Sequence, residues 1–337
     1  MTAQQMTNDG SYLKNIMIKK LIIITIISVQ FLTIYGQKNA PAVPDGYRSM
    51  TTLKVAYVFG RLDLVEEKPV VPNNIKKYSN LTYKKVGNRS LKLDLCHAKN
   101  LKKTAPLLVF IYGEAWKHGN KDKYLGYLID FAKKGYVTVS LEYRFSKEAK
   151  FPAAVNDVKC AVKWLKSNAE KYHINPEQVA VIGGSSGGYL AMMLAYTSDI
   201  SEFEKGCSIT GVDSRVQLVV DLYGPPDLTN KQVIEKTDAN EFIGKPYSQA
   251  SGLYKKASPI NYLTKDDPPT LIFHGTIDDV VPVEQSGILR SRLNKVGIPV
   301  EYYKLKGWPH FMEAGTKIND YCQYYMNRFF EKYIPIE

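Results

Sequence analysis

A serine in a glycine-rich turn is the first residue that could do chemistry. The segment Gly183-Gly184-Ser185-Ser186-Gly187 follows a short β-like run and precedes a helical pattern. It matches G-x-S-x-G, in which small neighbours let strand and helix pass closely around an exposed serine. Such a serine can attack a carbonyl, while the next backbone N–H faces the developing oxyanion. A shift of one residue makes Ser186 the nucleophile, and a turn that is merely rich in Gly and Ser also fits.

A serine nucleophile needs a base and an acid that orients the base. After a turn of this type, the order along the chain is Ser, Asp or Glu, then His. Only His274 and His310 follow Ser185. His274 ends an apolar run, where histidine is usually structural, whereas His310 lies in a loop after the last strand-like segment. We therefore predict His310 as the base, with Asp278 and Asp279 both open as the acid.

The oxyanion of a tetrahedral intermediate needs a second backbone donor, usually from the loop after the third strand. Here this loop is the segment Tyr112-Gly113-Glu114-Ala115-Trp116 and the three residues after it. Gly113 permits close backbone approach. We predict that Trp116 packs beneath the site and contributes to substrate binding.

Strand-like and helical patterns alternate along most of the chain. Leu81–Val86 and Leu91–Leu95 flank a turn and predict a hairpin, which would form an antiparallel edge. Continuous apolar runs such as Leu107–Tyr112 are typical of strands buried on both faces. The alternation predicts a parallel α/β sheet with helices on both faces. The further expected elements are strands at 137–141, 179–182, 216–222, 271–273 and 300–305, and helices after 152 and at 186–196, 284–295 and 317–330.

Several segments together resemble the carboxylesterases and the acetyl xylan or feruloyl esterases of the α/β-hydrolase superfamily, relatives of hormone-sensitive lipase. The likeness runs from about Leu81 to about Phe330. It rests on the turn and loops above and on further matching segments in the same order: Leu91–Asp94, Tyr143–Ser146, Phe151–Ala153, Asp221–Pro225, Ala257–Ile260, His274–Asp278, Val281–Pro282 and Gly307–Phe311. It implies an α/β-hydrolase fold, with a mostly parallel eight-stranded sheet and a small cap or lid.

The resemblance also settles two choices that the residues leave open. The family pattern Gly-x-Ser-(Ala or Ser)-Gly-Gly places the nucleophile at Ser185 and makes Ser186 an oxyanion donor. It likewise favours Asp278 as the acid. The loop departs from the family's His-Gly-Gly-Gly-Trp or His-Gly-Gly-Ala-Trp, because Glu114 replaces a glycine. We expect its carboxylate to point away, so that only backbone N–H groups of Gly113, Glu114 or Ala115 face the oxyanion.

The N-terminus predicts export. Lys19 and Lys20 precede a short apolar run, and Gly36 follows it, so residues 1–36 have the pattern of a signal peptide. An uncleaved membrane anchor is the alternative, and Met17 is an alternative start. Residues 37–78 are expected to be an irregular lead-in and 79–337 the catalytic domain. Residues 224–258 break the strand–helix rhythm and are expected to be a cap-like insertion.

The net charge and the cysteines give less information about function. The 337-residue chain has a net charge of +12 spread along its length, without the basic stripe interleaved with aromatics that binds nucleic acid. No membrane association is expected beyond the alternative anchor. The four scattered cysteines match no metal spacing, and we expect buried free thiols, although export would permit a disulfide.

The predicted function is hydrolysis of a carboxylic ester through Ser185, His310 and Asp278, with no metal or organic cofactor. The substrate is expected to be a small-molecule or polysaccharide ester, and the protein to be secreted or periplasmic. Two alternatives stay open. One is a serine peptidase of the same fold, and the other is a non-catalytic binding protein, which the departure at Glu114 keeps in consideration.

Overall fold

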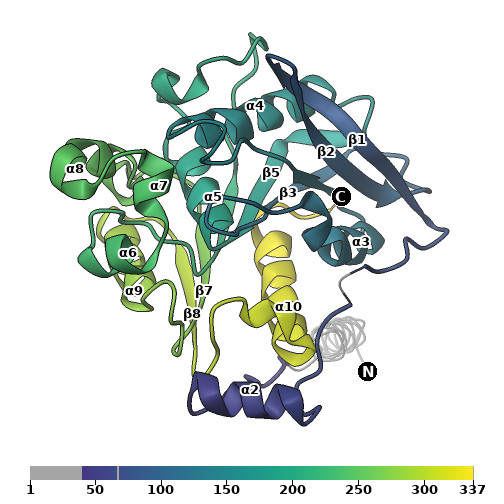
Figure 1. The fold of residues 1–337 in the computed structure, drawn as a ribbon. Coiled ribbons are helices and arrows are strands. Elements are labelled where there is room, and N and C mark those ends of the chain that lie inside the picture. Colours follow the sequence, from purple (N-terminus) through teal and green to yellow (C-terminus); the bar gives the residue numbers. More distant parts are fainter. Residues whose placement is uncertain (1–39, 67, 337) are drawn as a thin grey trace, which may run out of the picture. The chain divides into compact units, whose positions relative to one another are not determined.

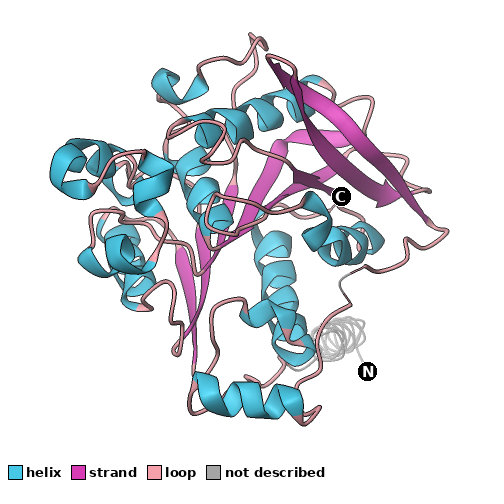
Figure 2. Cartoon of the chain, in the orientation of Figure 1, coloured by secondary structure: helices cyan, strands magenta, loops and turns pink. Residues whose placement is uncertain are grey.

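A single eight-stranded sheet organises the chain. The computed structural model describes residues 40–66 and 68–336, and everything below lies in the compact unit Val43–Glu337. The strand order is β1-β2-β4-β3-β5-β6-β7-β8 (Figures 1 and 2). The strands are β1 (Ile75–Val86), β2 (Arg89–Ala98), β3 (Ala105–Ile111), β4 (Val137–Leu141), β5 (Ile174–Gly184), β6 (Leu218–Leu222), β7 (Thr270–Gly275) and β8 (Val300–Leu305).

The pairing agrees with the predicted sheet. β1 and β2 form an antiparallel hairpin, and β2 is antiparallel to β4. All the other neighbours are parallel, so the hairpin is the antiparallel edge that the sequence predicts. Parallel strands end at the same edge of a sheet, and ligands bind there in α/β folds. The turns after β5, β7 and β8 therefore lie at one edge.

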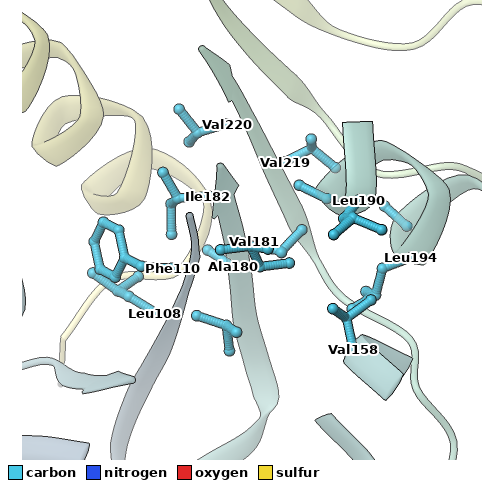
Figure 3. Close-up of a cluster of buried hydrophobic side chains, with 14 of the residues drawn as sticks. Leu108, Phe110, Val158, Ala180, Val181, Ile182, Leu190, Leu194, Val219 and Val220 are labelled. Carbon is cyan, nitrogen blue, oxygen red and sulfur yellow. The ribbon is translucent and has the colours of Figure 1, made fainter. Parts of the chain in front are cut away.

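Helices cover both faces of the sheet. The helices are α2 (Met50–Val58), α3 (Leu125–Lys133), α4 (Ala153–Ser167), α5 (Ser186–Tyr196), α6 (Lys231–Lys236), α7 (Ala239–Ile243), α8 (Tyr247–Lys256), α9 (Glu284–Lys295) and α10 (Thr316–Tyr333). In the central strands, Phe110 and Ile182 point towards α10, whereas Val219 points towards α5 (Figure 3). This alternation explains why β3 and residues 179–182 of β5 are apolar on both faces and buried.

The N-terminal lead-in is more ordered than predicted. It contains α2, whose capping box is formed by Ser49 and Thr52. The segment 43–65, here called the N-terminal strap, holds the chain around His310 on both sides. Before that histidine, the indole of Trp308 donates to the carbonyl of Pro44 at 3.1 Å. After it, residues 63–65 pair with residues 314–316. These contacts join segments about 260 residues apart, which local sequence patterns cannot indicate.

Residues 224–258, expected to be a cap, form the three short helices α6, α7 and α8. The segment packs onto the rest of the protein through α7. Phe242 stacks on Trp116 at a centroid distance of 4.6 Å, and Lys117 forms ion pairs with Asp238 and Glu241. The insertion therefore supports the loop after β3.

The cysteines correct one expectation. Cys160 in α4 and Cys207 form a disulfide across 47 residues, whereas Cys96 and Cys322 are buried free thiols, as expected. The sequence prediction treated all four alike because the two bonded residues are far apart in sequence.

The predicted signal peptide, residues 1–36, lies outside the described residues. Within the part of the chain that the structure describes, none of the helices has the length and apolar character needed to span a bilayer.

Candidate active site

Ser185 lies on a tight turn between β5 and α5. Its backbone angles, φ 55° and ψ −124°, fall outside the ordinary regions for a side-chain-bearing residue. Two glycines make the turn possible. A Cβ on Gly183 would lie 2.2 Å from the carbonyl oxygen of Gly187, and one on Gly187 would lie 2.0 Å from that of Ile111. The glycine spacing in the sequence therefore reflects backbone packing at this turn.

The structure brings Ser185, His310 and Asp278 into one line of hydrogen bonds. The Nε2 atom of His310 is 2.8 Å from the Oγ of Ser185, and its Nδ1 is 2.7 Å from the Oδ2 of Asp278. Ser185 and His310 are 7% and 8% exposed, so both are largely buried but keep some contact with solvent. The carboxylate on His310 is thus that of Asp278, as the resemblance implied, and not that of Asp279.

Asp278 is held as an anion. Its Oδ1 accepts hydrogen bonds from the backbone N–H groups of Val280 and Val281, and its Oδ2 also contacts Nε2 of His274 at 3.1 Å. Burial alone would raise the pKa of Asp278, but the hydrogen bonds with His274 and His310 hold that pKa well below its usual range. An ionised Asp278 can orient the imidazole of His310 and stabilise it when it takes a proton.

His274, expected to be structural, makes three polar contacts around the acid. Its Nδ1 is 2.7 Å from the Oγ of Ser286 in α9, and its Nε2 is 3.0 Å from the carbonyl oxygen of Val281. His274 therefore buttresses the carboxylate that faces His310. In the sequence, the signal for this supporting role was its position four residues before Asp278, at the end of β7.

The loop after β3 lies against the serine turn. A Cβ on Gly113 would lie 2.6 Å from the carbonyl oxygen of Gly184 and 3.0 Å from the Cβ of Ser185. The next three residues, Glu114, Ala115 and Trp116, all have positive φ angles, of 78°, 57° and 59°. Each such residue costs about 1–2 kcal/mol relative to glycine. The loop is thus held in a conformation that its own residue types disfavour.

The Glu114 side chain contacts two basic residues that follow it in the chain. Its carboxylate pairs with His118 and with Lys123. These contacts agree with the expectation that the carboxylate avoids the oxyanion position. Trp116 is 1% exposed and packs on Tyr189 and Phe242. It therefore packs beneath the site as predicted, but its burial leaves it no surface for the predicted substrate contact.

The carbonyl groups of this loop fix the direction of its N–H groups. The hydroxyl of Tyr143 donates to the carbonyl oxygens of Tyr112 and Gly113, at 3.0 and 3.2 Å. The C=O and N–H of a trans peptide point in opposite directions, so the N–H groups of Gly113 and Glu114 point away from Tyr143. Neither N–H has a backbone acceptor within the described ranges, which leaves both available to a ligand.

Ser186, the first residue of α5, joins the two halves of the site. Its Oγ accepts a hydrogen bond from the backbone N–H of Trp116 at 3.2 Å. Its own backbone N–H lies at the helix N-terminus, where no intrahelical acceptor exists. The side chain is therefore used structurally, and the backbone donor stays available beside Ser185.

The strand order, the turn after β5 and the loop positions define an α/β-hydrolase fold. The sequence profile of the BD-FAE family matches residues 93–293, which is more than half of the chain. The protein belongs to the BD-FAE family.

Named relatives are esterases. The chain is 32% identical over 227 residues to Esterase LipC of Mycobacterium tuberculosis, covering 65% of this chain and 56% of LipC. It is 33% identical over 218 residues to the probable carboxylic ester hydrolase LipM of the same organism, covering 61% of this chain and 49% of LipM. The chain thus spans only about half of the length of these two relatives.

A solved structure extends the likeness over a whole chain. The truncated form of a carbohydrate esterase from gut microbiota superposes with a TM-score of 0.66 at 27% identity, covering 78% of this chain and 98% of that one. The likeness covers almost the entire fold of that esterase.

Proposed function

We propose that this protein is a serine carboxylic-ester hydrolase. The observation that carries the proposal is the unbroken line of hydrogen bonds from Ser185 through His310 to Asp278. This arrangement of nucleophile, base and orienting acid is the one that acyl transfer requires. The names of the relatives, Esterase LipC and a carbohydrate esterase, support the same reaction.

The proposed reaction has two steps. The Oγ of Ser185 attacks the ester carbonyl while Nε2 of His310 takes its proton. The tetrahedral intermediate collapses, the C–O bond to the alcohol breaks, and His310 returns the proton to the departing alcohol. Water then attacks the acyl-enzyme with His310 again as base, and the acid is released. Asp278 keeps the imidazole oriented throughout, since its own pKa is held low.

The oxyanion would be bound by backbone N–H groups. We assign this role to Ser186 and to the segment Gly113–Ala115. Support comes from the contact of Gly113 with the serine turn and from the N–H groups that point away from Tyr143. Each such donor typically contributes about 2.7–4 kcal/mol to the transition state.

The proposed substrates are acyl or acetyl esters on a carbohydrate. The likeness to a carbohydrate esterase over 98% of that chain supports this class. Phe311, directly after His310, is 45% exposed and lies edge-on to the imidazole at 4.9 Å. An exposed aromatic ring at this place offers a flat apolar surface to the alcohol part of a substrate.

We also propose that the protein acts outside the cytoplasm. The signal-peptide pattern of residues 1–36 is the first support. The second is the Cys160–Cys207 disulfide, because such bonds form and persist in oxidising compartments.

Labelling and turnover of a Ser185 variant test the proposed reaction. Ser185→Ala should lower kcat on p-nitrophenyl acetate by at least about 10³-fold. A fluorophosphonate should label the wild type and Ser186→Ala but not Ser185→Ala, because only the Ser185 hydroxyl contacts His310. Wild-type turnover by Ser185→Ala would overturn the proposal. Comparing acetylated xylan, methyl ferulate and p-nitrophenyl esters of rising chain length then identifies the substrate class.

A further inference from the structure

A buried polar cluster lies behind the serine turn, and the reaction proposed above does not use it. Its centre is Glu313, three residues after His310. The hydroxyl of Tyr223 donates to the Oε1 of Glu313, and the buried Oε2 has no hydrogen-bond partner among the described residues. Tyr223 follows β6, and its ring is fully buried. A buried carboxyl group with an unpaired oxygen costs free energy of folding, so its presence here suggests a functional role.

The cluster touches the backbone directly before the nucleophile. A Cβ on Gly184 would lie 3.0 Å from the hydroxyl oxygens of Tyr124 and Tyr223, and 3.4 Å from the Oε1 of Glu313. These polar atoms therefore converge on the residue that precedes Ser185. The Glu313 main chain is itself fixed, since Nδ2 of Asn319 donates to its carbonyl oxygen at 2.9 Å.

The same tyrosine lies against the base. The ring of Tyr223 is 4.5 Å from the imidazole of His310, centroid to centroid, with a 56° angle between the planes. The backbone of Tyr223 has a φ angle of 49°, a conformation that a bulky residue adopts only when its surroundings impose it. The hydroxyl is anchored at Glu313 and the ring forms a wall of the His310 site.

The contacts of Glu313 are those of an anchor for Tyr223. Burial raises the pKa of its carboxyl, and the hydrogen bond from the Tyr223 hydroxyl opposes this shift. The Oε1 atom accepts that hydrogen bond, so Glu313 acts on the site through the tyrosine.

We propose that Tyr223 and Glu313 are positioning residues for His310. The hydrogen bond between them fixes the Tyr223 ring, and the ring keeps the imidazole on the line between Asp278 and Ser185 while a proton moves. This inference rests on the proposed role of His310 as the base. It predicts that loss of the Tyr223 hydroxyl reduces turnover, although this hydroxyl hydrogen-bonds Glu313 rather than Ser185 or His310.

Tyr223→Phe tests the inference against a matched control. Tyr196→Phe also removes one buried tyrosine hydroxyl, which bonds Thr270 at 2.8 Å. Tyr196 ends α5, about 15 Å from its start beside Ser185. Both variants should lower Tm by similar amounts. Only Tyr223→Phe should lower kcat on p-nitrophenyl acetate, by about tenfold, with KM within about twofold.

Variants of Glu313 complete the test. Glu313→Leu removes the acceptor and should reproduce the kcat loss of Tyr223→Phe, whereas Glu313→Gln keeps an acceptor and should recover most of it. The double variant Tyr223→Phe/Glu313→Leu should be no slower than the slower single variant, because both break the same hydrogen bond. Additive losses, or equal kcat values in Tyr223→Phe and Tyr196→Phe, would overturn the inference.

Fluorophosphonate labelling separates this failure from failure of the proposed function. A labelled wild type whose kcat is insensitive to Tyr223 and Glu313 contradicts only the positioning role. A wild type that is not labelled at Ser185 contradicts the proposed reaction and the positioning role together.

Discussion

The two halves of the candidate site, the serine turn and the loop after β3, both have strained backbone conformations, but for different reasons. The serine turn has one strained residue, Ser185, and glycines at the points of closest approach. The loop after β3 has three consecutive residues with positive φ, and none of them is glycine. The conformation of the turn thus follows from its local sequence. The conformation of the loop is imposed by contacts with distant residues, chiefly the stacking of Trp116 on Phe242 and the ion pairs of Lys117 with residues around α7.

Because of this difference, we expect the serine turn and the loop after β3 to tolerate substitutions differently. A side chain added to the turn meets backbone atoms that cannot move aside. A weakened contact to the loop lets it relax towards ordinary φ angles, which moves its N–H groups but leaves the fold intact. Damage to the turn should therefore be all-or-none, and damage to the loop should be graded.

The largest expected effect is on the turn. Gly187→Ala would place a Cβ 2.0 Å from the carbonyl oxygen of Ile111, so strand and helix must separate. We expect loss of at least about 100-fold in kcat/KM, or loss of folded protein. The control is Gly252→Ala in α8, where a Cβ meets nothing within 4 Å. Esterase assays and circular dichroism compare the two. An active Gly187→Ala enzyme would show that the turn is not rigid.

The next effect is on the loop. Phe242→Leu weakens the stacking on Trp116 and should lower kcat by about tenfold, since a small displacement of oxyanion donors is costly. Phe330→Leu, in the core contact between α10 and α3, should cause a similar loss of about 1 kcal/mol in stability with unchanged kcat. If both variants lose kcat equally, the loop does not depend specifically on α7.

A smaller effect should appear on stability. Glu114 has a φ angle of 78°, so Glu114→Gly relieves strain and should stabilise the protein by up to about 1 kcal/mol, raising Tm by roughly 2 °C. Glu114→Ala loses the same ion pairs but keeps the Cβ, and its Tm should not rise. Thermal unfolding of both variants decides the matter, and equal Tm values would mean that backbone strain at this position is negligible.

The smallest effect concerns pH. The pKa of Asp278 in the folded protein lies well below its value of about 3.9 in an unfolded chain. The ionised group therefore contributes stability above about pH 4, and this contribution disappears as the pH falls through the lower folded value. The Tm difference between wild type and Asp278→Asn should therefore shrink as the pH falls below about 4. A difference that stays the same below pH 4 as at pH 5, measured by thermal unfolding at each pH while the protein remains folded, would contradict the ionised state of Asp278 as the source of this stability.

Sequence reasoning succeeded where the determinants are local. The parallel sheet with its antiparallel edge hairpin followed from the alternation of apolar runs and helical periods, and the number of eight strands followed from the resemblance. The structure also brings together Ser185, Asp278 and His310. The chain order selected His310, whereas the family resemblance selected Ser185 over Ser186 and Asp278 over Asp279. Each of these residues lies in the segment that follows a strand, and the carboxyl ends of parallel strands lie at one edge of the sheet.

The missed features all depend on contacts between distant segments. The N-terminal strap, the Cys160–Cys207 bond and the Tyr223–Glu313 pair join residues whose separation carries no periodic signal. The stacking of Trp116 on Phe242 was likewise not predictable, because Phe242 lies in the 224–258 insertion. Local patterns specify elements, but they do not specify which loops pack against which.

The N-terminal strap has a consequence for the order of assembly. Pro44 and the indole that donates to it are 264 residues apart in sequence, so the strap leaves the ribosome long before the loop that it holds. Contacts of such high sequence separation form late and slowly. The loop that carries His310 therefore reaches its final setting only after residues 308 to 316 have been synthesised and have met the strap. A nascent chain forms the serine turn from neighbouring residues, but the position of its histidine is fixed later, by the first described segment of the chain.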